Sequence, residues 1–406
     1  MYICLNYSAM EQERSKSNHL ISSTPTHFSR SITESINWNS RLIGLIGPRG
    51  VGKTTMLLQA VKQLHGFDPK AIYLSLNDIG FANNSLHSIV GKFYSMGGER
   101  IFIDDVHKHP QWSEHIKTVY ETYPNLQIVF AGSSTIDMLK HYANLSQRAT
   151  IYHVNNLSFR EYLISQGVIT LKPLSLSEIA KNHIDISRSI PSDVKILPLF
   201  DKYLTQGAYP LRVSSVEEVR QSIERFIIGT IEEDMLNIEG YDSRNSFKLK
   251  QLMGHFLQNA PFKPNLVSIS NRANLHRNTL IGYLFHMEKA KLINLLYPSG
   301  SAISILQKPE QVYMANPNMS VLLGGNRTNR NALLQTFAVN QLLNNHELRL
   351  SKYDAIEVDG ELLLGFETIK RVPKKLRENP NTLTLVDGIE VGSDKRIPVW
   401  MLGMLY

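Results

Sequence analysis

The clearest chemical pattern in the chain is GPRGVGKT at residues 47–54, with an apolar run before it and a helix-like run, TMLLQAVKQL, after it. Glycines in such a loop let successive backbone amides point at phosphate oxygens, and the helix that follows adds its positive end. The spacing G-x-x-x-x-G-K-[ST] between a strand and a helix therefore predicts a nucleoside triphosphate site. The residues expected to contact the phosphates are Gly47, Pro48, Arg49, Gly50, Val51, Gly52, Lys53, Thr54 and Thr55.

Two adjacent carboxylates follow in the segment IFIDDVHK at 101–108. In this interpretation Lys53 reaches the β- and γ-phosphates, and the Thr54 hydroxyl ligates Mg²⁺. An apolar strand would carry Asp104 to the edge of the same site, where its carboxylate holds the Mg²⁺ shell. Asp105 can polarise the attacking water; the alternative is that it caps the turn that follows.

Polar residues near these motifs are further candidates. The run QIVFAG ends in Ser133 and Ser134, and this position lets Ser134 touch the γ-phosphate or orient its water, with a helix cap as the alternative. Arg148, before the fifth strand-like run, can supply positive charge to a γ-phosphate in the same or a neighbouring subunit, or be a surface arginine. We expect His107 and His109 to face solvent or line the rim of the site.

These residues need a framework, and the pattern of the first half of the chain supplies one. Five β-rich runs alternate with helical segments, which implies a parallel sheet covered by helices on both faces. Residues 158–240 look helical, with Ser158 placed to cap the segment FREYLISQ. The five runs are RLIGLIG (41–47), AIYLSL (71–76), RIFID (100–104), QIVFAG (127–132) and ATIYHV (149–154).

The composition shifts near residues 240–250. Three helix-sized pieces follow within 249–297, and a β-like tail then runs through Pro298 and Gly300. That order is typical of a winged helix-turn-helix. Residues 330–406 continue with a helix-like segment and several strand-like runs, which predict a mixed α/β unit.

Two sets of residues in this half could carry chemistry. Asp354, Glu367 and Lys370 stand in the order of a metal-dependent nuclease site, in which two carboxylates bind Mg²⁺ and a lysine assists the attacking water. The alternative is a degenerate nuclease scaffold used for binding or assembly. Side chains near the presumptive recognition helix can meet DNA, or the segment can serve only for docking. They are Asn271, Arg272, His276, Arg277, Asn278 and Thr279.

Composition limits the class of protein. A length of 406 residues suggests two or three domains, and 42% apolar with 19% charged residues fits a soluble globular chain. The single cysteine, Cys4, excludes a disulfide framework and a cysteine-based metal site, which suits a reducing cytoplasm. We expect neither a membrane span nor a secretory signal. The net charge of +7 permits an acidic partner such as nucleic acid but is mild for this length.

The order GPRGVGKTT, IFIDDVHKHPQW, IVFAGSST and SQRATIYHVNNLSFREYL resembles the AAA-superfamily ATPases of bacteria and archaea that carry a winged helix and a C-terminal nuclease-like domain. The resemblance covers about residues 31–406 and is most specific within 41–165. It implies ATP and Mg²⁺ as cofactors and a sheet ordered 5-1-4-3-2. It also implies that Ser133 or Ser134 senses the γ-phosphate and that Arg148 lies near the nucleotide.

The sequence departs from that family at four positions. Asp105 stands where the family usually has glutamate, so hydrolysis is expected to be slow. Gln147 replaces a glycine or basic residue before the arginine. Gln335 stands where related chains carry a helical glutamate, and the spacing between Glu367 and Lys370 departs from the usual acid-x-Lys. Both changes in the C-terminal domain should weaken metal binding there.

The fold class we expect is α/β: a P-loop NTPase sheet of the AAA type with a helical extension, then a winged helix and a small α/β nuclease-like domain. The function we expect is an ATP-dependent conformational switch, with an ATP-gated DNA-binding protein or nuclease as the alternative. ATP is favoured over GTP because no Asn-Lys-x-Asp segment appears. Partners would be nucleic acid or protein, not a membrane. The expected segments are 1–30 (poorly ordered), 31–157 (ATPase core), 158–240 (helical lid), 241–305 (winged helix) and 306–406 (nuclease-like).

Overall fold

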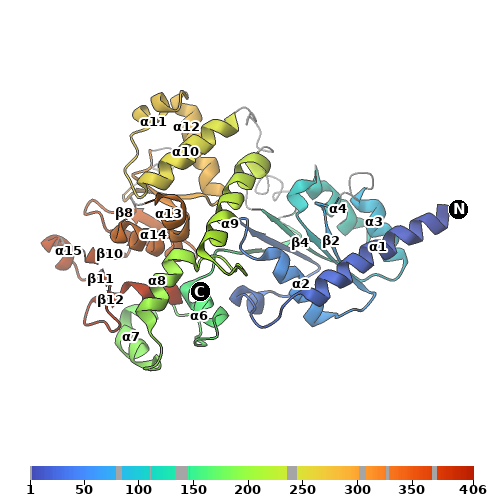
Figure 1. Cartoon of the computed structure of the whole chain (residues 1–406), viewed down its shortest axis with the longest axis horizontal. Helices are drawn as coiled ribbons and strands as arrows, with labels where there is room; N and C mark the ends of the chain where they lie inside the picture. The colour runs from blue at the N-terminus through green and yellow to red at the C-terminus, as the bar shows by residue number, and fades with distance from the viewer. Residues whose placement is uncertain are drawn as a thin grey trace. The chain divides into compact units, whose positions relative to one another are not determined.

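The computed structural model divides the chain into two compact units (Figure 1). Unit 1 comprises Met1–Asn155 and Glu233–Gly240, and unit 2 comprises Asn156–Glu232 and Tyr241–Tyr406. The residues that the structure describes are 2–78, 85–109, 111–133, 145, 147–235, 245–300, 308–325, 329–367 and 373–406.

Unit 1 is built on a five-stranded sheet in which every pair of neighbouring strands is parallel. The strand order β2-β3-β4-β1-β5 confirms the order 5-1-4-3-2 that the family resemblance implies. Strands β1 to β4 are mostly apolar and buried because both faces of the sheet are covered there, whereas the edge strand β5 is largely not buried. The five strands are β1 (Leu42–Gly47), β2 (Ala71–Ser75), β3 (Arg100–Asp104), β4 (Gln127–Ser133) and β5 (Thr150–His153).

Three helices cover this sheet: α2 (Lys53–Leu64) on one face, and α3 (Leu86–Ser95) with α4 (Trp112–Thr122) on the other. Successive side chains of a strand point to opposite faces. Accordingly Leu45 of β1 packs in the cluster with α2, whereas its neighbour Ile46 packs in the cluster with α3 and α4. The parallel sheet with helices on both faces agrees with the fold predicted from the alternating pattern.

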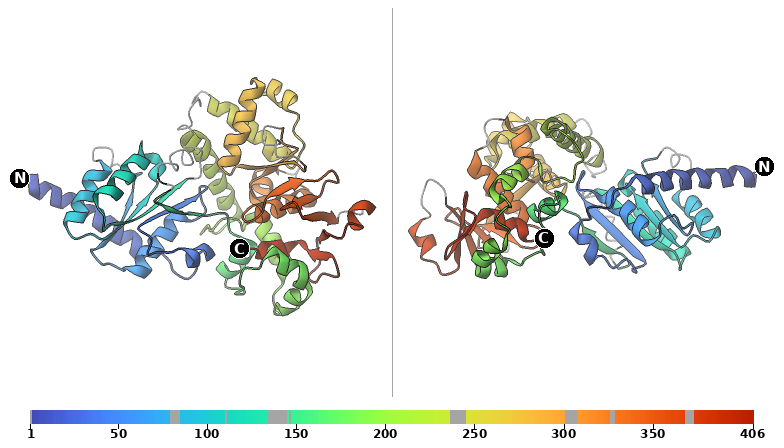
Figure 2. Two further views of the ribbon diagram at one scale, coloured as in Figure 1. Left: turned by 180° about the vertical axis from the view of Figure 1, so that it is seen from behind. Right: turned by 60° about the horizontal axis from the view of Figure 1, so that its bottom comes forward.

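A long N-terminal helix, α1 (Tyr2–Ser23), runs beside the sheet of unit 1, as Figure 2 shows from two further sides. Ile21 of this helix is buried. The Ser17 hydroxyl accepts a hydrogen bond of 3.1 Å from the backbone N–H of Tyr73 on the edge strand β2. A short 3₁₀ helix follows at Ser31–Ser35. The expectation of a poorly ordered segment before residue 31 is therefore wrong for these described residues.

Unit 2 is mainly helical in its first half and mixed in its second half. Its helices are α6 (Phe159–Ser165), α7 (Leu176–Ser189), α8 (Ile196–Gln206), α9 (Val216–Gly229), α10 (Ser246–Asn259), α11 (Leu266–Arg272), α12 (Arg277–Lys289), α13 (Pro317–Leu323), α14 (Arg330–Leu342), α15 (Lys374–Arg377) and the 3₁₀ helix η9 (Val399–Met404). Its strands are β6 (Ile293–Pro298), β7 (Gln311–Met314), β8 (Leu348–Leu350), β9 (Ile356–Val358), β10 (Leu362–Glu367), β11 (Thr382–Val386) and β12 (Arg396–Pro398).

These strands form one seven-stranded sheet in the order β12-β11-β10-β9-β8-β6-β7. Strand β6 pairs antiparallel with β7 and, further along, parallel with β8. The segments expected as a winged helix and as a nuclease-like domain are thus joined by backbone hydrogen bonds across the boundary drawn at residue 305. Within the described ranges, no helix combines the length and apolar character needed to cross a bilayer.

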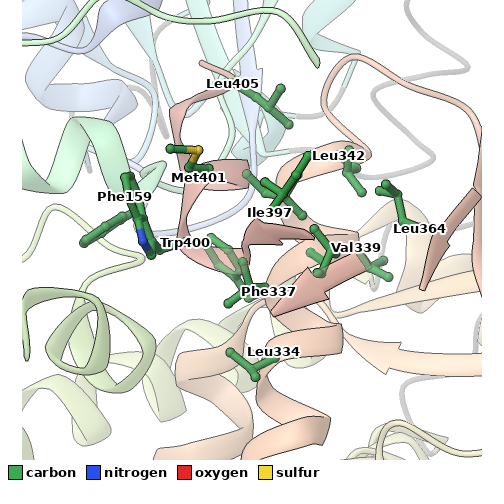
Figure 3. Packing of buried hydrophobic residues seen from close by; sticks show 14 of the residues in the cluster. Phe159, Leu334, Phe337, Val339, Leu342, Leu364, Ile397, Trp400, Met401 and Leu405 are labelled. Atoms are coloured by element: carbon green, nitrogen blue, oxygen red, sulfur yellow. The ribbon is translucent and has the colours of Figure 1, made fainter. Parts of the chain in front are cut away.

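The core of unit 2 joins residues that lie far apart in the chain (Figure 3). Phe159 begins α6, Phe200 lies on α8, Phe337 lies on α14 and Trp400 lies on η9, and all four side chains are buried. The rings of Phe200 and Phe337 have centroids 4.9 Å apart in an edge-to-face arrangement. The helical extension and the C-terminal α/β segment therefore share one hydrophobic core. Phe159 packs in this core.

We expect Phe337→Ala to destabilise unit 2 by about 3–5 kcal/mol, because deleting a buried ring leaves a cavity. Trp400 is one of three tryptophans in the chain, and Trp38 and Trp112 lie in unit 1. In a background with both of those replaced by Phe, Trp400 fluorescence should report urea unfolding of unit 2 alone.

The matched control is Val391→Ala, at a side chain that is 42% exposed in the same unit. It should change the free energy of unfolding by no more than about 0.5 kcal/mol. Equal urea midpoints for the two variants would contradict the shared core.

Candidate nucleotide-binding site

The predicted phosphate loop connects the end of β1, at Gly47, with the start of α2, at Lys53. Gly50 and Gly52 have φ angles of 82° and 96°, in the left-handed region that favours glycine. A Cβ atom on Gly47 would overlap the carbonyl oxygen of Val154, because β5 lies next to β1. No side chain caps α2, so its first amides remain available to an anion.

Residues from the N-terminal segment hold this loop in shape. The buried guanidinium of Arg30 donates a hydrogen bond of 2.7 Å to the carbonyl oxygen of Val51. The buried amide of Gln59, on α2, donates to the carbonyl oxygens of Pro25 and Phe28 at 2.8 Å each. The loop and the start of α2 are therefore tied to the chain that precedes β1, a role for Arg30 that the sequence analysis missed.

Lys53 lies at the centre of the site. Its ammonium group donates to the carbonyl oxygens of Gly47 at 2.7 Å and of Pro48 at 2.8 Å. Burial lowers the pKa of Lys53 to about 8, and the nearby carboxylates of Asp104 and Asp234 oppose that shift only in part. A buried cation next to the loop amides is the arrangement that a triphosphate requires.

Thr54 and Asp104, predicted as the Mg²⁺ ligands, lie in direct contact. The Thr54 hydroxyl donates to Asp104 Oδ2 at 2.5 Å, and the Tyr73 hydroxyl donates to the same oxygen at 3.0 Å. The other carboxylate oxygen accepts from the backbone N–H of Asp105 at 2.9 Å. Burial raises the pKa of Asp104, and the charge of Asp105 adds to the effect. This oxygen-rich pair suits a hard divalent cation.

Asp105 adopts a left-handed backbone conformation, with φ of 54°, directly before the 3₁₀ helix η3 (Val106–Lys108). Its side chain makes no capping hydrogen bond to that helix. Instead, Asp105 Oδ2 accepts from the Ser75 hydroxyl at 3.4 Å. The capping alternative is therefore not what the structure has, and the carboxylate lies at the same sheet edge as Asp104.

Asp234, which the sequence analysis missed, belongs to the same site. Its side chain is fully buried. Arg49 of the phosphate loop donates to it through two nitrogens, Nε to Oδ2 at 2.8 Å and Nη2 to Oδ1 at 2.5 Å. The hydroxyl of Ser133, at the end of β4, donates to Oδ2 at 2.6 Å. Arg49 also pairs with the exposed carboxylate of Glu233 at 2.8 Å.

His107 completes this cluster and is buried, so of the two positions expected for it, facing solvent or at the rim of the site, the first is wrong. Its Nδ1 accepts from the backbone N–H of Ser133 at 3.2 Å. The ring hydrogen therefore belongs on Nε2, which lies 3.4 Å from Asp234 Oδ1. Burial alone would raise the pKa of Asp234, but hydrogen bonds from Arg49 and His107 outweigh burial and lower it. The carboxylate stays ionised.

One signal in the sequence pointed to Asp234. Ile227, Ile231 and Asp234 follow one another at helical spacing, and all three side chains are buried. Asp234 is thus an acid on the apolar stripe of an otherwise amphipathic segment, which ends in the π-helical turn Thr230–Asp234. A charge in such a position is retained only when a partner satisfies it. The sequence alone gave no indication that the partner lies 185 residues away.

The other two catalytic candidates from the sequence are Ser134 and Arg148. Ser134 lies outside the described residues. Arg148 precedes β5, which is parallel to β1, and its guanidinium lies 3.0 Å from Glu121. Because the phosphate loop follows the carboxyl end of β1, Arg148 lies at the opposite edge of the sheet, about 17 Å away for a five-residue strand. The prediction that Arg148 lies near the nucleotide within the chain is therefore wrong.

Of the three nuclease-like candidates, the structure describes Asp354 and Glu367. Both carboxylate oxygens of Glu367 accept from Arg396, at 2.9 and 3.0 Å. Asp354 lies in a turn before β9 with φ of 57°, and Lys370 lies outside the described residues. Across the described part of the chain, no three or more His, Cys, Asp or Glu side chains gather closely enough to hold a metal ion.

Residues 39–163 match the family model described as an AAA domain. An uncharacterized protein of Methanocaldococcus jannaschii, MJ1637, is 25% identical over 295 residues, which are 68% of this chain and 61% of that protein. The chain thus spans about three fifths of the length of this curated relative. The match falls on the five-stranded parallel sheet of unit 1 and its phosphate loop, so this part of the chain is similar in sequence and in strand order to an AAA domain.

Solved structures with partial likeness include AMPPCP-bound DnaA from Aquifex aeolicus, with 15% identity and a TM-score of 0.29 over 63% of this chain and 84% of that one. The replication initiator DnaA bound to AMPPCP and single-stranded DNA has 14% identity and a TM-score of 0.31, over 67% and 92% of the two chains. With TM-scores this low, the likeness does not bear on function.

The lowered pKa of Lys53 predicts a pH dependence of nucleotide binding. Phosphates favour the ammonium form, so the pKa in the complex must exceed the value of about 8 in the free site. Affinity should be constant below about pH 7 and fall as pH rises through the free-site pKa, by up to about tenfold per pH unit. Titration calorimetry with ATP and Mg²⁺ across this range measures the effect. In Lys53→Arg, whose guanidinium stays charged, ATP affinity should not change with pH over this range. The same pH dependence in the wild type and in Lys53→Arg would show that Lys53 is not its cause.

Proposed function

We propose that this protein binds ATP with Mg²⁺ at residues 47–54 and acts as a nucleotide-dependent conformational switch with slow ATP hydrolysis. The observation that carries this proposal is the contact of Thr54 with Asp104 beside the buried ammonium of Lys53. A cation, a loop of amides and a pair of hard oxygen ligands are the groups that a metal-bound triphosphate needs.

The roles of the residues follow from their positions. The loop amides and Lys53 bind the phosphate oxygens, while Thr54 and Asp104 hold Mg²⁺, which neutralises charge on the phosphates. Asp105 accepts the proton of the attacking water or orients it. Its side chain is one methylene shorter than the glutamate found in similar ATPases. Asp105 therefore reaches the water less well, which favours slow turnover and a long-lived ATP complex.

The covalent path of the chain supports a switch. The chain leaves unit 1 after Asn155, directly beyond β5, and β5 pairs with the strand that leads into the phosphate loop. It re-enters unit 1 at Glu233, next to Asp234, whose carboxylate binds Arg49 of the loop. These two of the three connections between the units thus begin at elements that contact the phosphate loop. A change of loop conformation on hydrolysis would act on these two connections.

The decisive test is ATP binding by the full chain. Calorimetry with ATP and Mg²⁺ should give a measurable Kd for the wild-type protein, and Lys53→Ala should weaken binding at least about tenfold, since it removes a buried cation from the phosphates. Lack of ATP binding by the wild-type chain, or binding that is insensitive to Lys53→Ala, would reject the proposal.

Asp105→Asn serves as the matched control in the same experiment. It should still bind ATP, because Asp105 is not among the phosphate or Mg²⁺ contacts, but phosphate release should fall to background. Loss of binding together with loss of hydrolysis in this variant would assign Asp105 a role in binding instead.

For the segment after residue 245 our proposal is a winged helix. Three helices, α10, α11 and α12, are followed by the antiparallel pair β6 and β7, which is the order that such a domain requires. The C-terminal segment is proposed as a nuclease-like scaffold without cleavage activity. The reason is that Glu367, one of two predicted metal ligands, is engaged by Arg396 through both oxygens.

Contact with nucleic acid is a second candidate function. A cavity of about 400 Å³ between α10 and α11 is lined in part by Arg272, His255, Gln251 and Gln258. Guanidinium, imidazole and amide groups suit phosphate oxygens and base edges. In this reading, unit 2 binds single- or double-stranded nucleic acid and the nucleotide state of unit 1 regulates it.

A gel-shift series tests this second candidate. Arg272→Ala should weaken binding about tenfold, and wild-type affinity should fall between about 50 and 200 mM salt as phosphate contacts are lost. Lys202→Ala, at an exposed lysine of α8 in the same unit, is the control and should have little effect. Absence of a gel shift at the lower salt concentration would reject nucleic-acid binding as a function of this protein.

A further inference from the structure

The Asp234 carboxylate is surrounded by donors from three separate elements of unit 1. Arg49 comes from the phosphate loop, Ser133 from the end of β4 and His107 from η3. The three contacts, at 2.5–3.4 Å, surround a side chain that is fully buried. Each of these donors can equally serve a phosphate oxygen, because a carboxylate and a phosphate accept the same hydrogen bonds.

The cluster lies where the terminal phosphate of a bound nucleotide would extend. Ser133 is the register partner of Gly47, the first residue of the phosphate loop. Asp234 is also close enough to Lys53 to favour its charged form. A phosphate tail held by the loop amides and Lys53 must direct its terminal group toward Thr54 and Asp104, at the same sheet edge. The terminal phosphate therefore approaches the side chains of Arg49, Ser133 and His107, which contact Asp234.

We propose that Asp234 limits the preference of the site for ATP over ADP, by competing with the terminal phosphate for Arg49, Ser133 and His107. This inference rests on the function proposed above. When the terminal phosphate accepts these hydrogen bonds, two anions cannot share one buried donor set, and Asp234 must give up its contacts. ADP lacks the terminal phosphate and leaves the contacts in place.

Displacement of Asp234 can act on unit 2 through the covalent chain. Asp234 is the last residue of the π-helical turn that follows α9. Glu232, two residues earlier, already belongs to unit 2, where it forms an ion pair with Lys250. Release of Asp234 by ATP, but not by ADP, would thus free the chain segment that connects the phosphate site with α9. The presence or absence of one phosphate group would decide the state of this connection.

An opposite role for Asp234 leads to an opposite result. If the carboxylate only holds Arg49 ready for the phosphate, its removal should weaken ATP binding. If it competes with the phosphate, its removal should strengthen ATP binding. The sign of the change in ATP affinity therefore separates competition from simple positioning.

The test compares the Kd of a non-hydrolysable ATP analogue with the Kd of ADP, both with Mg²⁺, for the full-length chain by calorimetry. Asp234→Asn keeps the shape of the side chain and removes its charge. It should tighten binding of the ATP analogue about tenfold, the scale of one charge-assisted hydrogen bond, and change ADP binding by less than about twofold.

Glu233→Gln is the matched control. Glu233 is adjacent and also pairs with Arg49, but its side chain is exposed whereas that of Asp234 is buried, so the ratio of the two Kd values should stay near that of the wild type. Ser133→Ala keeps the inference testable if Asp234→Asn does not fold. It removes a shared donor and should weaken binding of the ATP analogue about fivefold, with ADP unchanged.

The two proposals fail in distinguishable ways. A wild-type chain that binds neither nucleotide would overturn the proposed function and this inference together. A wild-type chain that binds ATP, with an unchanged or lower preference for the ATP analogue in Asp234→Asn, would overturn this inference alone. Equal weakening of both nucleotides by Ser133→Ala would also overturn it.

Discussion

Parallel pairing of β3, β4 and β1 is the constraint on which the candidate site depends. Parallel strands end at the same edge of a sheet, so Asp104, Ser133 and Gly47 come together although they lie in separate parts of the sequence. The flanking helices bury both faces, which leaves this edge as the place where polar groups of the strands can meet a ligand. The chemistry of unit 1 therefore follows from the direction of its strands.

Two buried carboxylates at this edge have pKa values shifted in opposite directions, although burial alone would raise both. Asp104 is hydrogen-bonded by the neutral hydroxyls of Thr54 and Tyr73, and its pKa is raised because these bonds do not outweigh burial and the neighbouring charge of Asp105. Asp234 meets the guanidinium of Arg49, and its pKa is lowered. The first carboxylate is short of positive charge, which a divalent cation would supply. The second is already neutralised by the protein itself.

Local sequence patterns predicted the strands of unit 1 and the side chains that lie where those strands end. The five strands and the contact between Thr54 and Asp104 could be predicted because strand, loop and helix signals recur at fixed spacing, whereas the strand order was implied only by the resemblance to AAA-superfamily ATPases. Arg148 was placed wrongly, although the error was avoidable: a residue that precedes a parallel strand lies at the edge opposite the phosphate loop. Asp234 could not be paired from sequence, since its partner Arg49 depends on a chain crossing that no local signal encodes.

How the chain after residue 157 divides into domains could not be predicted from local sequence patterns either. Each segment after residue 157 has its own helical or strand-like pattern, which suggested separate domains. Whether Phe159 and Phe337 pack in one core depends on contacts between residues far apart in the chain, and apolar periodicity does not specify which buried faces meet.

The hydrogen bond from the Tyr73 backbone to Ser17 has a consequence for the solubility of the protein. Strand β2 ends the sheet, and an uncovered edge strand presents a row of unpaired amides and carbonyls that can template association with another chain. The first helix lies beside that edge and satisfies one of its amides with a side chain. A chain trimmed before β1 would lose this cover and gain a surface for strand-to-strand aggregation.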